Sequence, residues 1–233
     1  IANSAHGPAY MKNPLSEIKY CVDIVPGRAQ IFREKFNGEF AMADYHEAIA
    51  DPEVDIVSVC VPNYLHAPIT IDCLNAGKHV LCEKPTALNV MEASAMKKTA
   101  DENNLILNIG VVNRFNTAVN KVKELIDEGE LGNLYHVYCS FRSYRSIPGL
   151  GGQFTTKAMA GGGVLIDWGV HFLDLIMYCI GNPSINTVSA ATYSELGKEM
   201  NDYAFTSMWA GPPDYNGTYD VEDFVTGMVR TTG

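Results

Sequence analysis

The sequence predicts an α/β protein in which a doubly wound parallel sheet is followed by an α+β domain with an open mixed or antiparallel sheet. Two features predict this class. In the first half, short β-rich runs alternate with helical patterns, and the run at 54–62 is almost continuously apolar up to its closing proline, as is typical of a strand buried on both faces. In the second half, the run at 133–144 alternates between polar and apolar residues, which is typical of a sheet with one face in water.

The expected elements of the first half alternate between strand and helix. Strands are predicted at 17–24, 54–62, 78–85 and 105–111, and helices at 27–36, 66–77 and 89–103. Gly77 stands where a glycine usually follows a helix. Asn89 and Glu92, three residues apart, form a capping box for the helix that they begin. This rhythm predicts parallel pairing of the strands.

After residue 113 the pattern changes. The expected elements are a charged amphipathic helix at 116–132, a strand at 133–144, a glycine-rich stretch at 147–163, an apolar helix from 165 onward, and strands near 185–193 and 222–230. We therefore place a boundary near residue 113, with one domain at 1–113 and a second at 114–233.

The composition is that of a globular protein able to bury a core, with 47% of the 233 residues hydrophobic and 19% charged. A net charge of −10 and the lack of any basic run argue against nucleic acid as a partner, because phosphate binding needs clustered lysine and arginine. Six cysteines (Cys21, Cys60, Cys73, Cys82, Cys139 and Cys179) show no CxxC pair and no metal-ligand spacing. They favour a reduced, cytoplasmic setting, and no secretory signal is expected.

The apolar segment 161–181 is long enough to be considered as a membrane span. Asp167 and Asp174 near its middle would each cost about 2.5–3.5 kcal/mol of insertion free energy, which offsets most of what the apolar side chains return. We therefore expect a buried helix of a soluble protein and no membrane partner.

Three ionisable residues share one face of that helix. In LIDWGVHFLDL, Asp167, His171 and Asp174 are spaced by four and three residues, and the rest of the circumference is apolar, which is typical of a buried helix. A satisfied core histidine, a structural Asp167–His171 pair and a pair of metal ligands are all compatible with this spacing. The preceding residues Gly161–Gly163 would let the helix N-terminus approach a ligand and present its N–H groups, which favours a substrate site.

Parallel sheets bind ligands outside the carboxyl ends of their strands. The residues expected there are Asp23, Pro62, Asn63, Glu83, Lys84, Pro85 and Asn108. Asp23 can accept hydrogen bonds from a ribose diol, although an ordinary capping aspartate would give the same pattern. Lys84 can donate to an oxygen that becomes an alkoxide. The alternative for Lys84 is a solvated lysine paired with Glu83.

Together these segments resemble the Gfo/Idh/MocA family (glucose-fructose oxidoreductase, inositol dehydrogenase, rhizopine catabolism). The resemblance covers nearly the whole chain. It is carried by VDI at 22–24, the run at 51–85 that ends in CEKP, NRFN at 113–116, GELGNLY at 129–135 and GGGVLIDWGVHFLDL at 161–175. EKP and GGGxLxDxGxHxxD in this order and spacing are a specific combination.

The resemblance implies a dinucleotide-binding Rossmann domain at 1–113 and a substrate-binding α+β domain at 114–233. The open sheet of such a second domain often forms a dimer interface, so a homodimer or homotetramer is expected. The resemblance also implies that Lys84, Asp167 and His171 are the catalytic set. It places Asp23 at the adenosine ribose and the following residues around the nicotinamide half: Pro62, Asn63, His66, Glu83 and Lys84. Asn108, at the same sheet edge, is a further cofactor-binding candidate.

The sequence departs from the family pattern at both ends. The first strand and the phosphate-binding glycines do not precede IANSAH, and the sequence stops before the usual C-terminus of the family. We therefore expect a fragment of a longer chain.

The expected activity is that of an NAD(P)-dependent dehydrogenase or reductase, with hydride transfer between nicotinamide and a carbinol or carbonyl carbon of a sugar, polyol or related compound. His171 would take the hydroxyl proton, since its ordinary pKa suits a general base. Lys84 would stabilise the developing alkoxide, and Asp167 would orient His171 or a substrate hydroxyl. Asp174 is expected to give structural support. The loop 143–160, with Tyr144, Arg145 and Phe154, is expected to shape substrate specificity. Arg142 and Tyr144 are further substrate candidates, although a solvated position is favoured for Arg142 and Arg145.

NAD(H) is favoured as the cofactor, because Asp23 is followed by Ile24 and Val25 and a carboxylate repels a 2′-phosphate. Arg28 close by leaves NADP(H) open. Three other functions fit the sequence: a nicotinamide-binding regulatory protein without turnover, an NAD-using glycoside-cleaving enzyme of the same family, and a metal-dependent hydrolase or isomerase that uses Asp167, His171 and Asp174 as ligands.

Overall fold

A computed structural model describes residues 1–143, 147–203 and 210–232 of the chain. The chain divides into two compact units, each described by itself. Unit 1 consists of Ile1–Val61, Leu65–Glu83 and Val90–Ile109, and unit 2 of Pro62–Tyr64, Lys84–Asn89 and Gly110–Gly233. The predicted single boundary near residue 113 stays a prediction.

Unit 1 contains parallel strands, which confirms the predicted class of its sheet. The strands are β1 (Tyr20–Val22), paired with β2 (Phe40–Met42), and β3 (Ile56–Val59), β4 (His79–Cys82) and β5 (Leu107–Ile109), which pair in the order β3-β4-β5. The observed strands are shorter than predicted. Each of the four predicted strands covers three or four residues of its predicted run.

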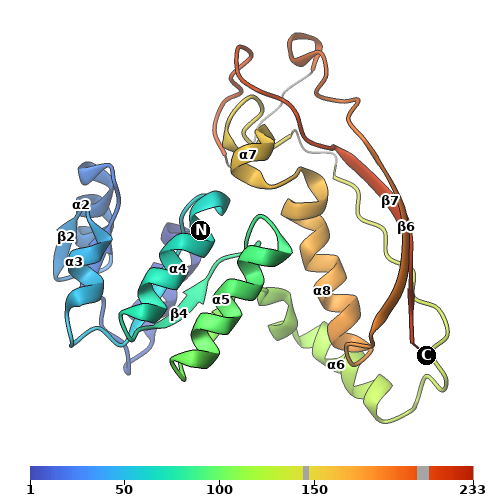
Figure 1. The fold of residues 1–233 in the computed structure, drawn as a ribbon, viewed down its shortest axis with the longest axis horizontal. Coiled ribbons are helices and arrows are strands. Elements are labelled where there is room, and N and C mark those ends of the chain that lie inside the picture. Colours follow the sequence, from blue (N-terminus) through green and yellow to red (C-terminus); the bar gives the residue numbers. More distant parts are fainter. Residues whose placement is uncertain (144–146, 204–209, 233) are drawn as a thin grey trace. The chain divides into compact units, whose positions relative to one another are not determined.

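Helices connect these strands, as parallel pairing requires. They are α1 (Gly7–Lys12), α2 (Pro26–Lys35), α3 (Tyr45–Ala50), α4 (His66–Asn75) and α5 (Val90–Glu102). Figure 1 shows α4 and α5 side by side. Gly77 follows α4 with a φ of +78°, which confirms the predicted glycine position and explains it, because residues with a Cβ rarely adopt this conformation.

The core of unit 1 lies between its strands and helices, and the cysteines contribute to it. Leu74, Met96, Val59 and Val80 are almost completely buried. Cys73 and Cys82 are buried beside them, and burial raises the pKa of their thiols to about 12 and about 11. These two cysteines therefore behave as small apolar residues, as predicted.

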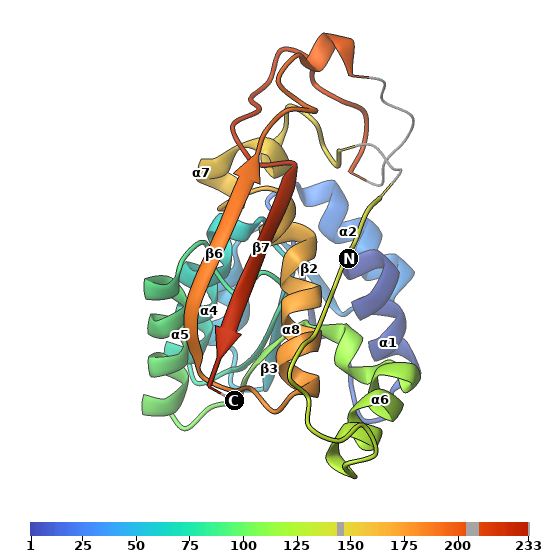
Figure 2. The ribbon, with the colours of Figure 1, turned by 90° about the vertical axis from the view of Figure 1, so that its right-hand side faces the viewer.

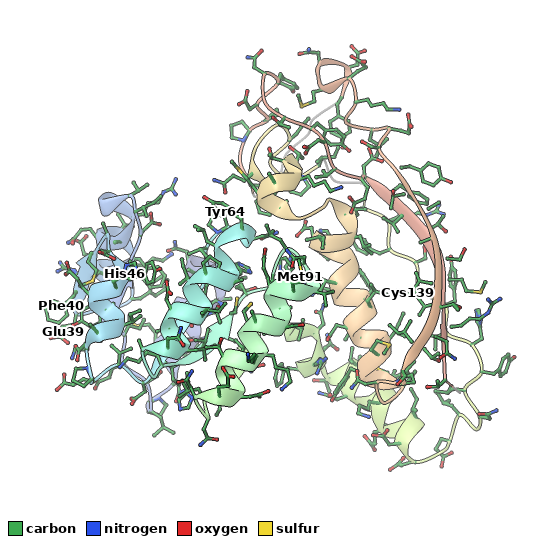
Figure 3. All side chains as sticks on the ribbon, viewed as in Figure 1. Glu39, Phe40, His46, Tyr64, Met91 and Cys139 are labelled. Carbon is green, nitrogen blue, oxygen red and sulfur yellow. The ribbon has the colours of Figure 1, made fainter. Side chains whose placement is uncertain are left out.

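Three elements of unit 1 are not anticipated by the sequence reasoning: the N-terminal turn Ala2–His6 with α1, strand β2, and helix α3. Glu39, Phe40 and His46 mark the β2–α3 region in Figure 3. The usable signal for α3 was Asp44, whose side chain accepts a hydrogen bond from the His46 N–H at 2.9 Å, as an N-cap aspartate does.

Unit 2 contains helices and one antiparallel pair of strands. Its helices are α6 (Thr117–Asp127), α7 (Lys157–Ala160) and α8 (Val170–Cys179), and its strands are β6 (Ile185–Tyr193) and β7 (Phe224–Thr231). Figure 2 shows β6 and β7 as a two-stranded ribbon, and they pair from Ile185–Thr231 to Tyr193–Phe224. The predicted strands at 185–193 and 222–230 and the antiparallel sheet are confirmed.

The predicted strand at 133–144 is wrong for the residues that the structure describes. Residues 133–143 form no strand and are exposed, with Cys139 projecting from this segment in Figure 3. Alternation assigns side chains to two faces, but a strand also needs a hydrogen-bonded neighbour. Residues 133–142 make no backbone hydrogen bond to β6 or β7 in the described part of the chain.

The helix that carries Asp167 is half-buried, so the prediction of a buried helix is wrong. It packs mainly against α6 and the turn Val112–Phe115, which cover one side. Lys157–Cys179 has a mean hydropathy of 1.3 and is long and apolar enough, by length and composition only, to cross a membrane. Gly161 interrupts this stretch with a φ of +85°.

Candidate functional site

Lys84 and Asp167 form an ion pair within unit 2. The Lys84 Nζ lies 2.8 Å from Asp167 Oδ1 and 2.9 Å from the Asp167 backbone oxygen, and it donates to both. The two side chains are 22% and 17% exposed. Lys84 is therefore not the solvated lysine of the alternative interpretation, and the structure brings together two of the three residues expected to be catalytic.

Asp167 belongs to a π-helical turn, Leu165–Gly169, that leads into α8. Its backbone N–H donates to the Gly163 oxygen at 3.0 Å. Single π-helical turns inside helices are frequent at functional sites. A Cβ on Gly169 would lie 2.7 Å from the Leu165 Cδ1, so a larger residue there would require the Leu165 side chain to shift.

His171 follows Asp167 by four residues, in the first turn of α8. Its ring meets the Trp168 ring edge to face, with centroids 5.9 Å apart. Trp168 in turn stacks on Phe141 at 4.6 Å, and Phe141 stacks on Phe172 at 4.9 Å. This aromatic cluster orients the helix face that carries His171.

Asp174, the third residue of the stripe, binds Arg114 through both carboxylate oxygens. The Arg114 Nε donates to Asp174 Oδ2 at 2.8 Å, and a second guanidinium nitrogen donates to Oδ1. The hydrogen bonds to Asp174 raise the pKa of Arg114. The guanidinium also lies over the Tyr178 ring, 5.2 Å from its centroid. A two-point contact of this kind fixes α8 to the turn before α6, as expected for a structural residue.

The glycine triplet before this helix has a structural explanation that the sequence reasoning missed. A Cβ on Gly163 would lie 1.9 Å from the Glu222 backbone oxygen. The Val164 N–H donates to that oxygen at 3.0 Å, and the Leu165 N–H donates to Glu222 Oε1 at 3.2 Å. The expectation that this helix N-terminus presents these N–H groups to a ligand is therefore wrong: Glu222 binds them.

The cofactor candidates of unit 1 lie at or near strand ends. Asp23 directly follows β1, is half-buried, and accepts the Val25 N–H at 2.8 Å. His66 is buried at the start of α4 and donates from Nε2 to the Val61 oxygen at 2.9 Å, so it fixes the loop after β3. Glu83 directly follows β4 and is buried. Asn108 lies within β5 rather than beyond its carboxyl end, so its predicted position is wrong by one or two residues.

The remaining candidates belong to unit 2. Pro62 and Asn63 help to line a small hollow together with Gln153, Phe154, Met159 and Ala160. The Asn63 side chain donates to the Ala160 oxygen at 2.9 Å. Arg142 is exposed, as expected. Tyr144 and Arg145 lie outside the described residues.

Comparison with known proteins gives the family. A profile described as "Oxidoreductase family, NAD-binding Rossmann fold" matches residues 1–111, and one described as "GFO/IDH/MocA C-terminal domain" matches residues 119–233. The chain belongs to the Gfo/Idh/MocA family. The resemblance drawn from EKP and GGGxLxDxGxHxxD is thereby confirmed.

Two curated Gfo/Idh/MocA relatives are similar over nearly the whole chain. D-glucoside 3-dehydrogenase of Escherichia coli is 32% identical over 231 residues, with 99% of this chain and 64% of the relative covered. Levoglucosan dehydrogenase of Pseudarthrobacter phenanthrenivorans is 29% identical, with 97% and 61% covered. A solved structure of levoglucosan dehydrogenase in complex with NADH and levoglucosan superposes with a TM-score of 0.80 at 26% identity, over 99% of this chain and 61% of that one. The chain thus spans less than two thirds of these relatives.

Three residues that fix parts of the candidate site were not predicted: His6, Arg114 and Glu222. Their partners are Glu83, Asp174 and the backbone N–H groups of Val164 and Leu165. Arg114 is part of NRFN, so its motif was seen without its role. The other two carry no local signal, because each meets a partner more than 50 residues away in sequence.

Proposed function

We propose that this chain is part of an NAD(H)-dependent oxidoreductase that acts on a CH–OH group of a sugar, polyol or related compound. The observation that carries the proposal is the ion pair between Lys84 and Asp167. Asp167 precedes His171 by four residues. The names of the two relatives support the same substrate class.

Each of the three residues has a distinct role in this proposal. Lys84, held by Asp167, donates to the substrate oxygen and stabilises it as it becomes an alkoxide. His171 takes the hydroxyl proton. A bound nicotinamide supplies the hydride acceptor, so that the carbinol loses a hydride and a proton and becomes a carbonyl. Asp167 therefore holds Lys84, and its expected orientation of His171 or of a substrate hydroxyl stays a prediction.

The residues of unit 1 fit a dinucleotide. Asp23 is a half-buried carboxylate directly after a parallel strand, in a turn fixed by its own hydrogen bond from Val25. The second oxygen of such a carboxylate is suited to a ribose diol. In this proposal Glu83 of unit 1 also binds the cofactor, as do Pro62, Asn63 and Lys84 of unit 2, and His66 fixes the loop after β3. We favour NAD(H), with NADP(H) as the alternative.

Replacing Asp23 by asparagine is expected to weaken NADH binding and to narrow the preference for NADH over NADPH. The asparagine keeps the turn but removes the charge that repels a 2′-phosphate, so the ratio of the two dissociation constants should fall by about 10-fold. Fluorescence titration of the full-length protein with each dinucleotide measures both constants. An unchanged ratio in D23N contradicts the placement of Asp23 at the ribose, and binding of neither nucleotide to folded wild-type protein contradicts the proposed function.

We also propose that the protein is a cytoplasmic homodimer or homotetramer that associates through the β6–β7 sheet and binds neither nucleic acid nor membranes. Val188 and its cross-strand partner Val229 share one face of this sheet and are 63% and 42% exposed, which supports a covered sheet face. The net charge of −10 argues against nucleic acid. The ion pairs of Asp167 and Asp174 support packing of their helix inside a soluble domain.

A further inference from the structure

His6 and Glu83 form a hydrogen-bonded pair within unit 1, and none of the proposed roles uses His6. The His6 Nε2 donates to Glu83 Oε1 at 2.8 Å, and the two side chains are 9% and 11% exposed. His6 ends the N-terminal turn Ala2–His6, and Glu83 directly follows β4, so the contact joins parts of the chain that are 77 residues apart. Glu83 directly precedes Lys84.

The surroundings of this pair are poorly solvated. Burial, followed by the charge of Glu83, raises the pKa of the nearby Cys60 thiol to about 12. A carboxylate in such a position needs hydrogen-bond donors or a positive charge close by. His6 provides a donor from an element that is itself held, because Tyr10 in α1 shares a hydrogen bond with Ser58 in β3.

The backbone of Glu83 is fixed as well. Its N–H donates to the Val59 oxygen at 3.0 Å, which continues the β3–β4 ladder. Its oxygen accepts a hydrogen bond from the Cys82 thiol. The Glu83 N–H, backbone oxygen and Oε1 therefore all have partners in unit 1, and Lys84 extends from a residue that cannot shift without breaking these contacts.

We propose that His6 is a positioning residue for Lys84: by binding the Glu83 side chain, it fixes the end of β4 from which the lysine extends. The inference rests on the proposed function of Lys84. His6 touches neither substrate nor reacting atoms in this account, so its loss should lower kcat while substrate KM and NADH affinity change little.

The test compares His6→Gln with His6→Asn in the full-length protein. The two variants carry the same neutral amide, but only glutamine can place its nitrogen where the His6 Nε2 lies. We expect H6Q to retain kcat within about 3-fold and H6N to lose about 10-fold or more, because small displacements of a reacting group are costly. His46→Asn serves as the control, because His46 is 62% exposed and lies away from Glu83.

Oxidation of levoglucosan and myo-inositol with NAD+, together with NADH titration, gives kcat, KM and the dissociation constant. Wild-type kcat in H6N, or equal losses in H6Q and H6N, overturns the role of His6 and leaves the proposed function standing. A wild type without turnover overturns both proposals. If H6N does not fold, His6→Ser, whose side chain also cannot reach Glu83, takes its place beside H6Q; equal kcat in these two overturns the inference.

Discussion

Replacing Lys84 by methionine is expected to lower turnover of a sugar or polyol substrate by at least about 100-fold. Methionine keeps the length and much of the apolar stem, but it removes the ammonium group that Asp167 holds at 2.8 Å. The substrate oxygen would therefore lose the positive charge that stabilises it as it becomes an alkoxide. Steady-state oxidation measured by nicotinamide absorbance reports the loss.

Lys97→Met is the matched control for this experiment. Lys97 also forms an ion pair with an aspartate, Asp101, but its side chain is 75% exposed on α5. Exposed pairs of this type contribute at most about 0.5 kcal/mol, so K97M should retain normal turnover. A K84M protein that folds and turns over at a rate within a few-fold of K97M contradicts the role assigned to Lys84.

Gly163→Ala is expected to cause the largest loss of stability in the site region. The added Cβ would lie 1.9 Å from the Glu222 backbone oxygen, and backbone cannot rotate away as a side chain can. We expect the free energy of unfolding to fall by about 3 kcal/mol, at the upper end for overpacking. Thermal unfolding followed by circular dichroism measures the change. Activity should fall too, because the Gly163 oxygen accepts the Asp167 N–H.

Gly27→Ala controls for the general effect of adding a methyl group to a glycine. Gly27 lies in the first turn of α2, and an added Cβ there meets no atom within 4 Å. Alanine at such a helical position is expected to stabilise the protein by about 0.4–1 kcal/mol. If G163A unfolds at the same temperature as G27A, the contact with Glu222 does not constrain the start of the helix.

Local patterns in the sequence predicted the elements that depend on local rules. The apolar run at 54–62 predicted β3, and Gly77 predicted the end of α4. The same reasoning failed where an element depends on distant partners. Residues 133–144 alternate correctly for a strand, but those that the structure describes have no paired neighbour, and the Asp167 helix is largely apolar yet only half-buried.

In the candidate site, too, local spacing was predicted from the sequence and contacts between distant residues were not. The i,i+4 spacing of Asp167 and His171 is visible in the sequence, and the residues after β3 and β4 follow from the strand pattern. The pairing of Lys84 with Asp167 joins residues 83 positions apart, and no local period encodes such a contact. The contact of Glu222 with the helix N-terminus also joins residues that are distant in sequence. The sequence reasoning therefore took Gly161–Gly163 as room for a ligand, whereas the backbone of Glu222 lies there.

The formation of NADH by the full-length protein with a panel of polyols tests the proposed function most directly. Levoglucosan, myo-inositol and a methyl glucoside, each supplied with NAD+, cover the substrate types named for the relatives. The account predicts a rise in nicotinamide absorbance with at least one of them, and its loss in K84M. Folded wild-type protein that binds NADH but reduces no NAD+ with any of the panel would contradict the account and favour a nicotinamide-binding protein without turnover.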